Sequence, residues 1–171
     1  MLADFYGTFS TIAFTVFGLW MFVAQARFRE WMASPDHYRR ASAVSLQFAL
    51  PGIMSLIALI DTDSKVLWQW AFGVTSALAV VLLALLARRT GATPRGVNEV
   101  ANAVAIVLFV CIAVVSVWPG IVDDLGLSAP PRGVEFFFFC MLLLNGLVTA
   151  WLMLFSDTPA PGGDVSGSSL G

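Results

Sequence analysis

Hydrophobic residues fill five runs of this chain, each 20 to 22 residues long, and polar residues gather in the gaps between them. The runs are Phe5–Ala26, Ala41–Ile60, Val66–Ala87, Val97–Trp118 and Val134–Phe155. An α-helix rises about 1.5 Å per residue, so about 20 residues cross a hydrocarbon core of about 30 Å. A surface helix of a water-soluble protein would carry a polar stripe along such a run. The pattern therefore predicts an all-α, polytopic membrane bundle with five transmembrane helices within residues 1–156.

The gaps contain residues that predict where the helices begin. Ser34, Pro35 and Asp36 supply an N-cap, a proline at the first helical position and an acid in the first turn. The second helix is therefore expected to begin near Pro35, and Pro130 and Pro131 predict the start of the fifth. After Phe155 the chain is rich in Pro, Gly and Ser, so residues 157–171 are predicted to form a disordered cytoplasmic tail.

The composition agrees with a membrane protein. The mean hydropathy is +0.84, and 58% of the residues are hydrophobic. Five such helices in 171 residues leave too little polar chain to cover them in water. No basic residue precedes the first run and Arg27 follows it, so we expect a retained membrane helix rather than a cleaved signal peptide. The eight Arg against one Lys indicate a bacterial coding style, and we predict a location in the bacterial plasma membrane.

The basic residues are divided unequally between the two sides of the predicted bundle. Seven of the nine lie in the first and third gaps: Arg27, Arg29, Arg39, Arg40, Arg88, Arg89 and Arg95. Because basic loops remain in the cytoplasm, the N-terminus is predicted outside and the C-terminus inside. Six acids are then expected at the outer face: Asp4, Asp61, Asp63, Asp123, Asp124 and Glu135. Trp68, Trp70 and Trp118 are expected there as aromatic anchors at headgroup depth.

Residue types that carry catalysis are few. One histidine, His37, lies beside arginines and predicts no metal site. Cys111 and Cys140 lie within hydrophobic runs and are interpreted as small apolar residues. The sequence lacks the motifs of triad hydrolases, P-loop proteins and dinucleotide-binding proteins. We therefore predict no enzymatic activity, no cofactor, no metal and no nucleic-acid partner.

Uncharged polar residues recur every three or four positions along several predicted helices, so each set lies on one helix face. The candidate residues are these uncharged side chains together with the acid Glu99: Thr8, Thr11, Thr15, Asn98, Glu99, Asn102, Asn145 and Thr149. Two interpretations remain open. These residues permit tight packing and hydrogen bonds between helices, or they line a path for a solute across the membrane.

Two of these candidates have individual expectations. Asn145 lies near the middle of its run, where an amide is costly unless it is hydrogen-bonded, so we expect a bond to another helix or to an internal water. Glu99 lies in the first turns of its helix, where the helix dipole and Arg95 or Arg88 favour a carboxylate. No charged residue lies near the centre of any run, which argues against a proton-driven pump.

Two functions from different classes follow from these patterns. The first is a non-catalytic membrane subunit or accessory protein that acts through helix packing. The alternative is an oligomeric channel or transporter for a cation or a small neutral solute, because an acidic outer face attracts cations and repels anions. Five helices are few to enclose a pore, so a channel would need several copies. The expected partners are the lipid bilayer, and the protein itself or another membrane protein.

Overall fold

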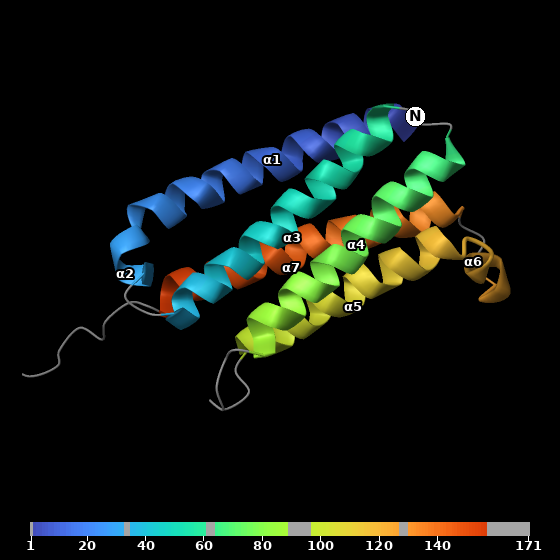
Figure 1. Ribbon diagram of the computed structural model, residues 1–171. Coiled ribbons are helices and arrows are strands. Elements are labelled where there is room, and N and C mark those ends of the chain that lie inside the picture. Colours follow the sequence, from blue (N-terminus) through green and yellow to red (C-terminus); the bar gives the residue numbers. More distant parts are fainter. Residues whose placement is uncertain (1, 33–34, 61–63, 89–96, 127–129, 157–171) are drawn as a thin grey trace, which may run out of the picture.

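The computed structural model describes residues 2–32, 35–60, 64–88, 97–126 and 130–156 (Figure 1). The described chain is all-helical. Its five long helices are α1 (Leu2–Ala26), α3 (Pro35–Ile60), α4 (Lys65–Arg88), α5 (Val97–Val117) and α7 (Pro131–Ser156). Each is long and apolar enough to cross a membrane, as expected of a multi-pass membrane protein. The predicted tail, residues 157–171, lies outside the described residues.

The helix starts at Pro35 and Pro131 agree with the sequence prediction. Most of the long helices extend past their hydrophobic runs, because backbone hydrogen bonding continues after the side chains become polar. Two short helices were not predicted: α2 (Phe28–Met32), which follows α1, and α6 (Ile121–Asp124), which follows α5. Gly126, in the left-handed region at φ 69°, follows α6 and donates a backbone hydrogen bond to Asp123.

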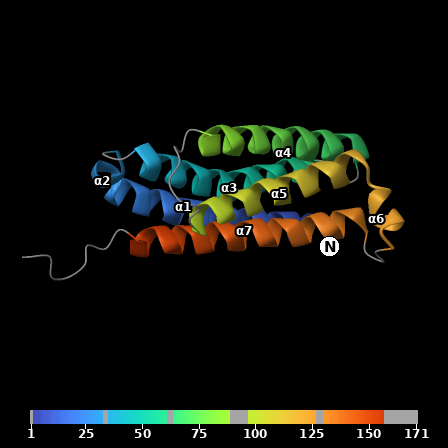
Figure 2. The same ribbon diagram turned by 90° about the horizontal axis from the view of Figure 1, so that it is seen from below.

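The long helices run side by side, and α2 and α6 mark opposite ends of the bundle (Figures 1 and 2). The end of α4 and the start of α5 lie at the α2 end, together with the end of α7. α3 is the central helix and packs against α1, α4 and α7, while α5 packs against α4 and α7. α1 packs mainly against α3, so it forms one edge of the bundle.

The core has two parts. The larger part is rich in aromatic rings, with the rings of Phe72 and Phe139 stacked at a centroid distance of 5.3 Å. The smaller part lies toward α2 and includes Trp20, Trp31 and Phe48. Beside it α3 and α7 come very close, because a Cβ added to Gly146 would lie 2.6 Å from Cε1 of Phe48. Only glycine fits at that position without a shift of the ring.

Candidate functional site

A buried carboxyl group, that of Glu135, lies one turn into α7 at the α6 end of the bundle. Its side chain is 0% exposed. Trp68, in the first turn of α4, donates a hydrogen bond from Nε1 to Glu135 Oε2 over 2.8 Å. The Arg132 guanidinium lies 5.3 Å from the centroid of the Trp68 ring, which is a cation–π distance. The indole therefore joins α4 to α7 through its N–H and holds Arg132 over its face.

Tyr6 of α1 completes this group, and we name Tyr6, Trp68, Arg132 and Glu135 the Glu135 cluster. Tyr6 is 1% exposed, and Phe72 and Phe136 lie edge-on to its ring. Within the described chain, the Tyr6 hydroxyl and Glu135 Oε1 are buried and make no hydrogen bond. Tyr6 and Trp68 both lie against Phe72, each with a ring-centroid distance of 6.2 Å, so the two residues belong to one aromatic layer. The Tyr6 hydroxyl and Glu135 Oε1 can each bind a small polar molecule such as water within this layer.

The burial of Glu135 and Trp68 inside the bundle was not predicted from the sequence. Glu135 was expected among the acids of the outer face, and Trp68 was expected as an aromatic anchor at headgroup depth. Trp70 and Trp118 are exposed, whereas Trp68 is buried. No local pattern in the sequence marks this burial, although the structure shows a regular one. Glu135 begins a buried stripe with alternating steps of four and three residues, which continues through Phe139, Leu142, Gly146, Thr149 and Met153. Four consecutive phenylalanines, at 136–139, hide the stripe because they make every face of α7 equally apolar.

A second polar group joins α3, α5 and α7 on the α2 side of the aromatic layer. The Asn145 amide donates to Gln47 Oε1 over 2.8 Å and to the Ala101 carbonyl oxygen over 2.9 Å. Gln47 is 1% exposed, so its amide depends on protein partners. Asn102 Oδ1, beside Ala101, is buried without a hydrogen bond among the described residues. We name Gln47, Asn145 and the Ala101 carbonyl group the amide cluster.

The expected hydrogen bond from Asn145 to another helix is therefore present. Gln47 was not singled out from the sequence, although a signal existed. Pro51 lacks the N–H that would bond the backbone carbonyl of Gln47, four residues earlier, so this turn of α3 is exceptional. Thr149 lies one turn after Asn145, and its hydroxyl donates to the Asn145 carbonyl oxygen over 2.7 Å.

The other candidate residues lie elsewhere. Thr8, Thr11 and Thr15 are on the exposed face of α1, and the last two donate hydrogen bonds to carbonyl oxygens of their own helix. Glu99 is exposed at the start of α5, and the side chain of Asn98 lies outside the described part. The structure thus brings Asn102, Asn145 and Thr149 into one region and leaves the threonines of α1 on the molecular surface.

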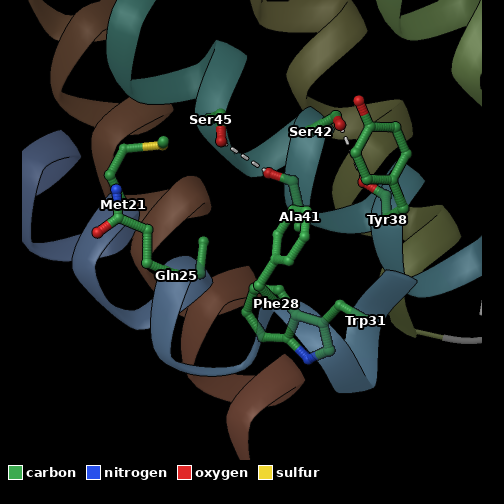
Figure 3. Close-up of a pocket in the computed structure, with 9 residues that line it drawn as sticks. Met21, Gln25, Phe28, Trp31, Tyr38, Ala41, Ser42 and Ser45 are labelled. Carbon is green, nitrogen blue, oxygen red and sulfur yellow. Dashed lines mark hydrogen bonds between the residues drawn. The ribbon is translucent and has the colours of Figure 1, made fainter. Parts of the chain in front are cut away.

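A pocket of about 410 Å³ lies between the end of α1, α2 and the start of α3 (Figure 3). It is lined by Met21, Ala24, Gln25, Phe28, Trp31, Tyr38, Ala41, Ser42 and Ser45. Trp31 stacks near Trp20, with ring centroids 5.5 Å apart, and Trp20 Nε1 donates to Ser45 Oγ over 3.1 Å. Trp20 of α1 therefore contacts both α2 and α3 beside the pocket, which is lined by Trp31 and Ser45.

Comparison of the chain with protein-family models, curated proteins and solved structures finds no match. Its function is therefore inferred from its own geometry. Within the described ranges, no group of three or more His, Cys, Asp or Glu side chains could hold a metal ion.

Proposed function

We propose that this protein is a non-catalytic subunit or accessory protein of the bacterial plasma membrane, acting through helix packing with itself or another membrane protein. In this proposal the N-terminus lies outside and the C-terminus inside, because seven of the nine basic residues fall in the gaps on one side. The proposal includes no enzymatic activity, in keeping with the few chemically reactive residues in the sequence.

The outer face of α1 carries this proposal. Gly7, Thr11, Thr15 and Gly18 follow one another at steps of four and three residues, and the last three are exposed. A Cβ added to Gly7 or Gly18 would meet no atom within 4 Å. Small side chains on this surface give no advantage in packing against lipid chains. They do allow the backbone of a second helix to come close to the backbone of α1. The face therefore suits a helix of another protomer or of a partner protein.

The interior supports the same proposal. The Asn145 amide of α7 bonds to Gln47 of α3 and to the Ala101 carbonyl oxygen of α5, so the amide cluster joins these three helices. The Glu135 cluster likewise joins α4 to α7. Polar groups that bond across helices in this way stabilise the bundle, and their partners come from the protein itself.

Disulfide cross-linking in native membranes tests the proposed face. In a chain with Cys111 and Cys140 replaced by alanine, Thr11→Cys is expected to give a cross-linked product of one discrete mass. That product is a covalent dimer for self-association, or a single larger species for another partner. Val74→Cys is the control. Val74 is exposed, and it lies about as far from the start of α4 as Thr11 lies from the start of α1.

Larger side chains in place of the two glycines would keep a second helix from approaching this face of α1. Gly7→Leu together with Gly18→Leu should abolish the Thr11→Cys product while leaving the protein in the membrane. Equal cross-linking at Thr11 and Val74, or none at either position, would contradict packing through α1.

A channel for a cation or a small neutral solute is the second candidate, and the exposed threonines favour it. Thr8, Thr11 and Thr15 would line a path only where the α1 helices of several copies face each other. Flux into liposomes distinguishes this candidate from the first. A channel predicts a stable ring-shaped oligomer and cation flux that Thr11→Val with Thr15→Val reduces. Anion-selective flux would exclude the path, and no flux would favour the accessory protein.

A further inference from the structure

We propose that the pocket between α1, α2 and α3 binds an anionic phospholipid, with part of an acyl chain in the pocket and the phosphate beside the arginines that flank it. The site is independent of the α1 face that carries the proposed function. Its volume, about 410 Å³, falls within the range of small-molecule sites.

Two of the polar side chains that line the pocket, those of Ser42 and Ser45, are bonded to the protein. Ser42 Oγ donates to the Tyr38 carbonyl oxygen and Ser45 Oγ donates to the Ala41 carbonyl oxygen, each over 2.9 Å. Ser45 also accepts the hydrogen bond from Trp20. The rest of the lining is mainly hydrocarbon surface, with the Gln25 amide and the Tyr38 hydroxyl as further polar groups. The apolar lining residues are Met21, Ala24, Phe28, Trp31 and Ala41. Such a lining suits an acyl chain and offers little to a sugar or a nucleotide.

The chain around the pocket is basic. Arg27 lies between the lining residues Gln25 and Phe28, and Arg39 and Arg40 lie between Tyr38 and Ala41. Residues 27–40 contain four arginines against two acids, and Asp36 pairs with Arg39 over 3.3 Å. Guanidinium groups bind phosphate through paired hydrogen bonds, so in this proposal the arginines next to the lining residues in the sequence hold the phosphate at the edge of the apolar pocket.

Figure 3 shows how these parts are arranged. Met21 and Gln25 of α1 lie on one side of the pocket, Ser42 and Ser45 of α3 lie on the other, and Phe28 and Trp31 of α2 lie at its lower edge in this view. Phe28 and Tyr38 are more than half exposed, as aromatic residues are where hydrocarbon meets headgroups. An anionic phospholipid carries a hydrocarbon chain and a phosphate at this same boundary.

Lipid titration of the purified full-length protein in detergent tests the proposal, with bound lipid counted by native mass spectrometry. Phosphatidylglycerol is expected to bind at least about tenfold more tightly than phosphatidylcholine. Arg27→Gln with Arg40→Gln should remove this preference. The matched control is Arg88→Gln with Arg89→Gln, which removes two charges from the other basic gap and should leave the preference intact.

A second pair of variants tests the pocket itself. Ser42→Phe places a ring among the lining residues and should lower phosphatidylglycerol binding about tenfold, whereas Ser42→Ala should not. Two results would overturn the proposal. One is equal binding of both lipids by the unmodified protein. The other is an equal loss of the phosphatidylglycerol preference in the two double-arginine variants, together with unchanged phosphatidylglycerol binding by Ser42→Phe. That result would mean that the lipid is attracted by positive charge and does not enter the pocket.

Discussion

The indole N–H of Trp68 on α4 donates a hydrogen bond to the buried carboxyl group of Glu135 on α7, over 2.8 Å. The two residues are 67 positions apart, so the bond ties together two distant parts of the chain. The hydrocarbon of a bilayer cannot hydrogen-bond to either group. The indole N–H and the carboxyl group therefore need partners within the protein.

Trp68→Phe is expected to lower stability by about 1–3 kcal/mol, because it leaves Glu135 Oε2 buried without its donor. The melting temperature of the purified protein in detergent measures the loss. Glu135→Gln should cost much less, since its amide oxygen can still accept from Trp68.

A double-mutant cycle separates this bond from general packing. Trp68→Phe with Glu135→Leu removes both partners, so the double variant should lose less stability than the two single variants added together. Additive losses would mean that the two side chains contribute independently.

The amide cluster predicts a second stability effect. Asn145→Leu removes the donor shared by Gln47 and the Ala101 carbonyl oxygen, and it should cost about 0.6–2 kcal/mol. Thr149→Val is the control, because the Thr149 hydroxyl bonds only within its own helix among the contacts described. Thermal unfolding that is unchanged by Asn145→Leu, or equally lowered by Thr149→Val, would contradict a role for the amide in joining the helices.

The contact between α3 and α7 predicts opposite results for two glycines. Gly146→Ala should destabilise the protein by about 1–3 kcal/mol, because the added methyl would meet the buried Phe48 ring. Gly18→Ala should be neutral or stabilising by up to about 1 kcal/mol, since the space above Gly18 is open and alanine favours helix. Urea or thermal unfolding of both variants provides the comparison, and a tolerated Gly146→Ala would show that Phe48 can move.

The proposed orientation predicts which positions a membrane-impermeant thiol reagent can reach. In intact cells expressing a cysteine-free background, cysteines placed at Asp63 and Asp124 should be labelled. Cysteines placed at Pro94 and Gly162 should be labelled only after the cells are opened. Labelling of Pro94→Cys in intact cells would reverse the orientation that the basic residues predict.

The helices themselves could be predicted from the sequence. A run of about 20 apolar residues spans a bilayer whatever its neighbours are, and a proline such as Pro35 or Pro131 marks a helix start locally. The short helices α2 and α6 escaped prediction because each has only a few residues and follows directly on a longer helix. The need of Asn145 for a partner also followed from its depth alone, since an amide in hydrocarbon must be bonded somewhere.

The rotation of each helix was decided only by the tertiary structure. A helix that is apolar on every side, as α7 is around Phe136–Phe139, carries no pattern that distinguishes its buried face. Which face turns inward depends on how side chains of different helices fit together, and that fit involves residues far apart in the chain. The sequence therefore placed Glu135 only at the outer end of its helix, whereas the packing of α1, α4 and α7 buries it beside Trp68. The same fit leaves Thr11 and Thr15 on the outside of α1, where the sequence showed only that they share a face.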